Sequence, residues 1–315
     1  MNAYLPTLKQ LQYLAALNDH GHFGRAAEAC FVTQSTLSAG LRELETLLGV
    51  SLVERTRRVV RFTPLGERIA AKARRVLREA DELADLARAA GKPLSGELRM
   101  GVIPTIAPFL LPRLLPGLRA AWPDLKLFLR EETSGAACEG LHRGLLDCVL
   151  LALPFGCGEV ETETLFDDAL WVAFPPGEEG NGKAAAARAI TPGEIDQDRL
   201  LLLEDGHCLR DHALAACNRP ELRAEATMLG TSLHTMVQMV GNGLGVTMVP
   251  QMALDAGILE GTGVTARPLK AEHAYRRIAL IWRRNSPREK DFRLLAAALR
   301  ESSPEKHRPT HDQDH

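Results

Sequence analysis

The sequence lacks the long apolar runs and catalytic signatures that would assign it to a membrane protein or a common enzyme class. None of its 315 residues fall in an apolar run of about 18 or more, so no membrane-spanning helix is predicted. The N-terminal segment MNAYLPTLKQLQYL has no basic stretch leading into an apolar one, and no secretory signal is expected. No GxSxG, HExxH, Walker A or CxxC motif occurs, and nothing identifies a cofactor or metal site. A cytoplasmic protein that is not an enzyme is the expectation.

Cysteine is also scarce, and this bears on where the protein works. The six cysteines are Cys30, Cys138, Cys148, Cys157, Cys208 and Cys217. So few in a chain of this length do not form a disulfide framework, and reduced thiols in the cytoplasm are expected. We interpret the first four as small apolar core residues with free thiols. Cys208 and Cys217 differ from these four, because charged residues lie beside Cys208 in the sequence.

Charge is distributed unevenly along the chain. The net charge of −2 combines +4 over residues 1–92 with −6 over the remainder. Between Ser51 and Arg78 there are nine basic residues and two acidic ones. A basic N-terminal third before an acidic body is typical of a nucleic-acid-binding head.

Apolar spacing over the first fifty positions predicts a helix-turn-helix. Leucines at helical intervals predict a first helix, which ends at the His20–His22 break, and Phe23–Cys30 predicts a short, small-residue helix. Thr33 is the expected N-cap of a longer helix with a leucine stripe, and Gly49 is its expected C-cap. A helix, a short helix, a tight turn and a longer helix together form a helix-turn-helix motif.

Polar residues on the longer helix, and a basic hairpin after it, predict contacts with DNA. Short hydrogen-bonding side chains at the start of a recognition helix suit base edges and phosphates. Leu52–Phe62 alternates like a two-stranded wing, whose arginines would contact phosphate or the minor groove. The alternative for each feature alone is a solvated surface. The predicted DNA-binding residues are Gln34, Ser35, Thr36, Ser38, Arg42, Arg55, Arg57 and Arg58.

A long helix should follow the head. Thr63 before Pro64 predicts an N-cap and a first-turn proline, opening a helix to about Ala90. Its one narrow apolar seam indicates a partner helix, and we predict a dimerising linker over residues 63–92, with packing on its own head as the alternative. The seam is Leu65, Ile69, Val76, Ala80, Leu83 and Ala87. Gly91–Gly96 then predicts a hinge.

From Glu97 onward, strands alternate with helical segments, which predicts α/β lobes with mostly parallel sheets. The glycines of Gly241–Gly245 end a helix and enter a strand, the reverse of a dinucleotide-binding fingerprint. Residues 304–315 are polar and predicted to be disordered. The predicted strands are Leu98–Ile103, Leu125–Leu129, Val149–Leu153, Leu200–Leu203, Val246–Pro250 and Ile278–Trp282, with helices at Thr231–Val240 and near Arg300.

Two segments carry a resemblance to a known family. FGRAAEACFVTQSTLSAGLRELETLLGVSLVERT, from residue 23, resembles the winged helix-turn-helix of LysR-type transcriptional regulators. GNGLGVTMVP, from residue 241, is similar to a turn in the effector region of those regulators. The resemblance implies a homotetramer on promoter DNA, homodimer contacts through the linker helix, and a contact with RNA polymerase.

The same resemblance implies an α+α/β fold class with three parts and a tail. These are a winged helix-turn-helix domain over residues 1–62, the linker over 63–92, a periplasmic-binding-protein-like effector region over 93–303, and the tail over 304–315. The effector region would have two α/β lobes. Lobe I would span about 95–167 and 272–303, and lobe II about 168–271.

Within that family, LLLEDGHCLRDHALAAC, from residue 201, resembles the redox segment of the peroxide-sensing OxyR subgroup. GVIPTIAPFLLP and LDCVLLALP are similar to the same subgroup. The resemblance implies that Cys208 reacts with hydrogen peroxide, that Cys217 resolves the product, and that antioxidant genes are activated. Ser134 stands where the subgroup usually has threonine, and Thr227 replaces a histidine of some members, so the reaction rate is in question. The implied peroxide pocket is Thr105, Ser134, His207, Arg210, Asp211 and Arg276.

Thiol chemistry explains why such residues would matter. Peroxide oxidises a thiolate to a sulfenic acid, which condenses with a second thiol. His207 and Arg210 beside Cys208 are expected to lower its pKa. If the segment to Cys217 is helical when reduced, the Cα atoms of the two cysteines lie ~13.5 Å apart, whereas a disulfide needs about 4.4–6.8 Å. Closing the bond would then refold the segment and change the contacts with DNA.

Two other functions fit the same residues. A LysR-type regulator could respond to a small molecule bound between its lobes, with both cysteines inactive. A thiol peroxidase that also binds DNA would sustain turnover with a reductant, but no segment predicts a site for one.

Overall fold

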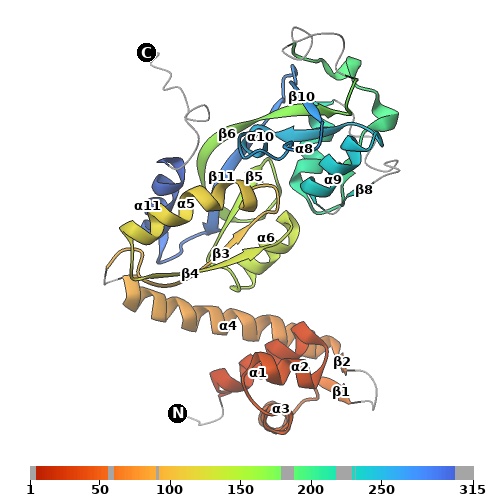
Figure 1. The fold of residues 1–315 in the computed structure, drawn as a ribbon. Helices are drawn as coiled ribbons and strands as arrows, with labels where there is room; N and C mark the ends of the chain where they lie inside the picture. Colours follow the sequence, from red (N-terminus) through yellow and green to blue (C-terminus); the bar gives the residue numbers. More distant parts are fainter. Residues whose placement is uncertain are drawn as a thin grey trace. The chain divides into compact units, whose positions relative to one another are not determined.

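The computed structural model describes residues 5–55, 60–89, 92–178, 188–217, 229–230 and 232–301. The chain forms two compact units, which divide at Ala87–Arg88, and Figure 1 follows each of them by colour. Over the described ranges, no helix combines the length and apolar character needed to cross a membrane. Arg57, Arg58, Thr227 and the 304–315 tail lie outside the described residues.

The first unit is built on helices whose ends are set by capping residues. Its first three helices are α1 (Leu8–His20), α2 (Phe23–Ala29) and α3 (Gln34–Leu48). Thr33 Oγ1 accepts the N–H of Thr36, and Gly49 ends α3 with a φ of 68°, so both predicted caps are confirmed. A Cβ on Gly40 would lie 2.8 Å from the Tyr13 ring, which shows how closely α3 approaches α1.

The wing follows α3 and is joined to it by a carboxylate. The strands β1 (Val53–Arg55) and β2 (Val60–Phe62) pair antiparallel. Glu45 Oε1 accepts the N–H groups of Leu52 and Val53, at 2.8 and 3.2 Å, which ties the wing to α3. Thr63 Oγ1 accepts the N–H of Gly66 at 2.9 Å, and this is the predicted N-cap of the next helix.

That helix, α4 (Pro64–Ala89), has apolar residues on two sides. Ala70 and Ala73 are buried in the core of the first unit, so α4 packs on its own head along this side. Leu65, Val76 and Leu83, from the predicted seam, are 41%, 48% and 70% exposed. These three residues of the seam therefore stay exposed although α4 packs on the head.

The second unit contains a seven-stranded mixed sheet. Its strands are β3 (Gly96–Val102), β4 (Leu125–Glu131), β5 (Cys148–Leu153), β6 (Val160–Phe174), β9 (Thr247–Pro250), β10 (Thr265–Pro268) and β11 (Tyr275–Arg283). The order is β10-β6-β11-β5-β3-β4, with β9 also on β6. Two further strands, β7 (Leu202–Leu203) and β8 (Leu229–Gly230), pair parallel with each other.

The prediction of mostly parallel sheets is wrong. β3 pairs parallel with β4 and β5, but every described pairing of β6 and β11 is antiparallel. The sequence analysis missed β6, because its first half, VETET, alternates polar residues and gives no apolar run. Along β6 the partner changes from β11 to β9 and β10 at Ala169–Leu170. Residues 168 and 272, where the chain is predicted to cross between the two lobes, lie just before this change and just before β11, and the division into lobes stays a prediction.

Helices cover this sheet and bring distant segments together. They are α5 (Ala107–Ala121), α6 (Ser134–His142), α8 (Cys208–Ala216), α9 (Leu233–Gly241), α10 (Gln251–Asp255) and α11 (Glu289–Glu301). α11 packs on α5, β6 and β11, where Trp282, Phe166 and Phe292 are fully buried. α6 and α8 both pack against β5 and β11. This shared support places the start of α6 beside the start of α8.

Candidate functional site

Cys208 and Cys217 lie at opposite ends of α8. Cys208 is the first residue of the helix, and Cys217 is its C-cap, whose N–H donates to the carbonyl of Ala213 at 3.0 Å. Both side chains are buried, and neither is in a disulfide. The segment between them is therefore helical, and nine residues at the usual rise separate the two Cα atoms by ~13.5 Å.

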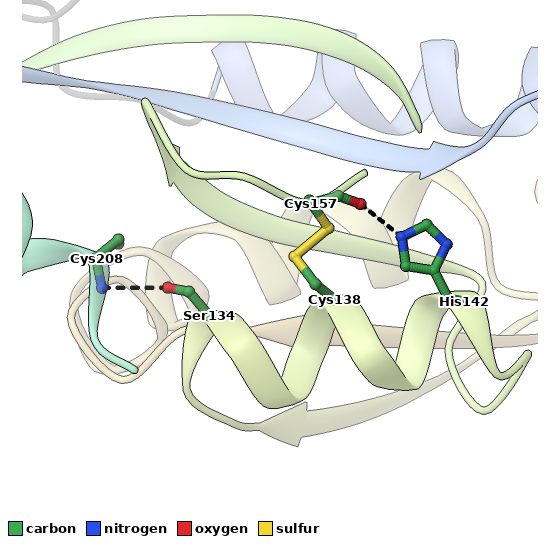
Figure 2. Close-up of a disulfide and its surroundings, with 5 residues drawn as sticks. All are labelled: Ser134, Cys138, His142, Cys157 and Cys208. Atoms are coloured by element: carbon green, nitrogen blue, oxygen red, sulfur yellow. Dashed lines mark hydrogen bonds between the residues drawn. A yellow bond between two sulfur atoms is a disulfide. The ribbon is translucent and has the colours of Figure 1, made fainter. Parts of the chain in front are cut away.

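A glycine turn places Cys208 against α6. Gly206 has a φ of 92°, which residues with a side chain rarely adopt, and a Cβ there would lie 3.5 Å from Thr133 Oγ1. The N–H of Cys208 then donates to Ser134 Oγ at 3.4 Å, and both residues are buried (Figure 2). The turn thus joins two segments that are 74 positions apart in sequence.

Arg276 organises a buried polar network near Cys208. Its Nε donates to Asp168 Oδ2 at 3.0 Å, while Nη1 and Nη2 donate to Thr105 Oγ1 and the Thr105 carbonyl at 2.7 and 2.8 Å. Asp168 Oδ1 accepts the N–H of Met252 at 3.0 Å. Both charged side chains are 0% exposed, so each depends on the other for compensation. The positive charge of Arg276 acts on the Cys208 thiol.

Burial is the largest influence on Cys208, and it raises the pKa of the thiol. The charge of Arg276 and hydrogen bonds with Ser134 and the backbone of Ala152 act in the opposite direction, while Asp211 raises the pKa further. The thiolate is therefore disfavoured in this conformation. The groups that favour it come from α6, β5 and β11.

The expectation that His207 and Arg210 lower this pKa is wrong for the conformation described. Burial lowers the pKa of His207, so its ring is neutral at pH 7. Arg210 instead forms an ion pair with Asp205 at 2.8 Å. His207 and Arg210 are buried and lie close to Cys208 in sequence. The charge that lowers the pKa of Cys208 nevertheless comes from Arg276, on the distant strand β11.

Two residues of this site were not predicted from the sequence. Asp168 lies on the buried face of β6, and the strand alternation that it shares with Phe166 and Leu170 is the signal that could have identified it. His212 is one helical turn after Cys208 on α8. Its Nε2 lies 3.1 Å from the Pro154 carbonyl oxygen, and among the described residues its Nδ1 is buried without a partner.

Acid should destabilise this protein partly through His212. Burial, and after it the charge of Arg276, lower the pKa of His212 from 6.5 to about 4. Between these values the unfolded chain binds a proton that the folded chain does not, so stability falls as the pH falls through this window. The expected loss is at most about 3 kcal/mol. The urea midpoint is measured at pH 7 and at pH 4.5. The difference between the two midpoints should be smaller for His212→Gln than for the wild type or for His273→Gln, a control at an exposed site. Equal differences in all three proteins contradict a role of His212 in the acid destabilisation.

The prediction of free thiols is wrong for one pair of cysteines. Cys138 and Cys157 form a disulfide with their Cα atoms 5.4 Å apart, inside the usual range of about 4.4–6.8 Å. Cys138 is on α6, one turn after Ser134, and Cys157 follows β5 (Figure 2). Their spacing matches no motif, so the pairing was not visible in the sequence. Burial raises the pKa of the other two thiols, Cys30 and Cys148.

Four of the predicted DNA contacts lie near the start of α3, and Arg42 lies one turn further along the same helix. Gln34, Ser35, Thr36 and Arg42 are exposed and Ser38 is half-buried. Arg42 Nη2 donates to Ser38 Oγ at 3.4 Å, and the first turn of α3 contains no acidic residue. The hydroxyls and N–H groups at this helix start can therefore meet an anionic ligand. Arg55 ends β1, at the edge of the described wing.

Two protein-family models match the chain. The model of the bacterial regulatory helix-turn-helix protein of the lysR family matches residues 8–67. The model of the LysR substrate binding domain matches residues 91–304. The first match lies within the first unit and the second within the second unit.

Similar proteins and structures extend over almost the whole chain. The regulator EstR of Acinetobacter baylyi is 40% identical over 298 residues, 95% of this chain and 97% of its own. The dual regulator OxyR of Escherichia coli K12 is 38% identical over 293 residues, 93% of this chain and 94% of its own. A full-length OxyR variant from Pseudomonas aeruginosa has a TM-score of 0.73 at 37% identity, covering 95% and 99% of the two chains. A hydrogen-peroxide-bound OxyR mutant from Corynebacterium glutamicum has a TM-score of 0.62 at 31% identity, covering 96% and 94%. This chain belongs to the LysR family of bacterial helix-turn-helix transcriptional regulators, in the group that includes OxyR.

Proposed function

We propose that this regulator senses hydrogen peroxide through Cys208 and converts the signal into a Cys208–Cys217 disulfide. The observation that supports it most is the position of the two cysteines, which mark the two ends of one short buried helix. Relatives named hydrogen peroxide-inducible genes activator, 38% identical to this chain, support the same function. The regulated genes would be those of antioxidant defence.

The chemistry needs only the two thiols and peroxide. The Cys208 thiolate attacks one peroxide oxygen, so an S–O bond forms and the O–O bond breaks, and the hydroxide that leaves takes up the proton released by the thiol and becomes water. The Cys217 thiolate then attacks the sulfenic sulfur, an S–S bond forms and the S–O bond breaks, and the hydroxide that leaves becomes a second water with the proton released by the Cys217 thiol. Thr105 and Ser134 would hold the peroxide, and Arg276 would favour the thiolate. His207, Arg210 and Asp211 would complete the pocket.

The switch follows from the length of α8. Because a disulfide requires Cα atoms about 4.4–6.8 Å apart, Cys208 and Cys217 cannot join while nine helical residues separate them. Closing the bond would break the helix together with the bonds that it makes, Arg210 with Asp205 and His212 with Pro154. Such a covalently driven refolding can alter how subunits present their DNA-binding heads.

Disulfide mapping tests this proposal. Reduced protein is treated with one equivalent of hydrogen peroxide, and peptides are mapped by mass spectrometry without reduction. We expect a Cys208–Cys217 cross-link that appears with peroxide and disappears with a dithiol. If peroxide leaves both cysteines as thiols, the proposal fails.

The DNA-binding half of the proposal predicts a loss of affinity in Arg42→Ala. Arg42 is exposed on α3 and would neutralise a phosphate, so affinity should fall about tenfold for every sequence, and the slope of log affinity against log salt should decrease by about one. Fluorescence anisotropy at several salt concentrations measures both. Arg119→Ala, an exposed arginine of α5, should bind like the wild type. An unchanged salt slope in Arg42→Ala contradicts this role.

The assembly proposed for this function uses α4. The exposed seam residues Leu65, Val76 and Leu83 would pair with the same helix of a second chain. Two such homodimers would form the homotetramer on promoter DNA and contact RNA polymerase. The part of the chain over residues 63–92 would then act as the linker between head and effector lobes.

A second candidate is a regulator that binds a small molecule. A cavity of about 470 Å³ beside α8 favours it, since this volume is in the range of ligand sites. EstR, whose name refers to no peroxide response, is as similar to this chain as OxyR is. Absence of the peroxide-dependent cross-link would favour this candidate. The cavity is lined by Leu153, Pro154, Asp211, His212, Ala215, His273, Tyr275 and Arg277.

A further inference from the structure

The Cys138–Cys157 disulfide joins the two segments that hold the start of α8. One is α6, which supplies Ser134, and the other is the end of β5 with the loop after it. None of the chemistry proposed for Cys208 and Cys217 uses this bond. The two segments that it joins nevertheless also contact α8.

On the α6 side, two polar contacts and the disulfide lie along one face. Ser134, Cys138 and His142 are four residues apart, so they share a face of the helix (Figure 2). Ser134 Oγ accepts the N–H of Cys208 at 3.4 Å, and His142 Nε2 lies 2.5 Å from the carbonyl oxygen of Cys157. Cys138 is bonded between them. The same face therefore reaches α8 at one end and the loop at the other.

On the other side, β5 and its loop also contact α8. The backbone of Ala152 hydrogen-bonds the Cys208 sulfur, and the carbonyl oxygen of Pro154 lies 3.1 Å from His212 Nε2. Cys157 follows three residues later. The disulfide thus joins two segments, α6 and the loop after β5, each of which also contacts the first half of α8.

We propose that Cys138–Cys157 is a second redox site, which cellular dithiols open and whose closed form makes Cys208 more reactive towards peroxide. The proposal rests on the proposed function of Cys208. A closed bond fixes the spacing between Ser134 and Ala152, the two groups that hydrogen-bond Cys208, and a preorganised pocket reacts faster than a loose one. The regulator would then respond both to peroxide and to the reducing power of the thiol pool.

The opening reaction is a thiol–disulfide exchange. A dithiol thiolate attacks one sulfur of the bond, a mixed disulfide forms, and the second thiol of the reagent displaces the remaining cysteine. Two electrons pass from the dithiol, which becomes a disulfide, and Cys138 and Cys157 each gain a proton. Cys157 is 8% exposed and lies in a loop whose neighbours Gly156, Gly158 and Glu159 are exposed, so this is the side from which a dithiol would attack.

Two measurements test the proposal. The full chain is treated with dithiothreitol under native conditions, and alkylation with mass spectrometry follows the bond while circular dichroism follows the fold. In a Cys217→Ala background, where oxidation stops at the sulfenic acid, dimedone labelling measures the rate at Cys208. The rate is compared between the intact chain, the dithiothreitol-opened chain and Cys138→Ala/Cys157→Ala, with Cys30→Ala as control. If the double variant does not fold, the dithiothreitol-opened chain alone gives the oxidation rate without the disulfide.

We expect the bond to open in the folded protein and Cys208 oxidation to slow about threefold or more when it is open. Cys30→Ala should keep the intact rate. A bond that opens only on unfolding, or equal rates with the bond closed and open, overturns this inference and leaves the proposed function standing. No labelling of Cys208 in any form overturns the proposed function itself, and this inference with it.

Discussion

Cys208→Ser should abolish the peroxide response while DNA binding persists. Serine fits the space of a buried cysteine and can keep its place at the start of α8, but its hydroxyl is not ionised at neutral pH and forms no sulfenic acid or disulfide. Consumption of stoichiometric peroxide should fall by about 100-fold or more. The footprint on promoter DNA should be the same with and without peroxide and should match that of the reduced wild type.

Cys148→Ala is the matched control for this variant. Cys148 is also a buried thiol of the same unit, and burial raises its pKa, yet it has no place in the proposed chemistry. Its peroxide-dependent change of footprint should survive. If Cys208→Ser kept a peroxide-dependent footprint, another group would have to be the sensor. Equal melting temperatures of the variants would exclude unfolding as the cause.

The first unit was predictable because local residues determine it. Thr33, Gly49 and Thr63 cap their helices as the sequence indicates, and each cap acts within a few positions of its own residue. The wing strands follow from a short alternating segment. In the second unit, β6 was missed because half of it is exposed and polar, so its strand character comes from pairing with β11 and not from its own pattern.

The site was predictable only in part because its contacts are long-range. The family resemblance identified Cys208, but the hydrogen bond from Arg276 to Asp168 spans 108 positions and depends on the order of strands in the sheet. Local charge favoured His207 and Arg210 as the groups that lower the thiol pKa. The fold reverses that expectation, since it buries Cys208 and turns Arg210 towards Asp205. How deeply a helix start is buried cannot be inferred from its neighbours in sequence.

Arg276→Gln should both destabilise the second unit and slow the oxidation of Cys208. The variant removes the guanidinium that compensates the fully buried carboxylate of Asp168, which keeps its hydrogen bond from the N–H of Met252. Removing one partner of a buried ion pair costs about 3–5 kcal/mol of folding free energy. The Cys208 thiol also loses the charge that opposes the effect of burial on its pKa. Urea denaturation measures the first effect and dimedone labelling the second.

Asp168→Asn/Arg276→Gln separates these two effects. A neutral amide pair removes the uncompensated charge, so at least half of the lost stability should return. The oxidation of Cys208 should stay slow, because the double variant still lacks the positive charge. Asp168→Asn alone should be destabilised yet oxidise Cys208 at least as fast as the wild type, since Arg276 then acts without its counter-ion. If the double variant regained stability and oxidation rate together, Arg276 would act on Cys208 only by keeping the unit folded.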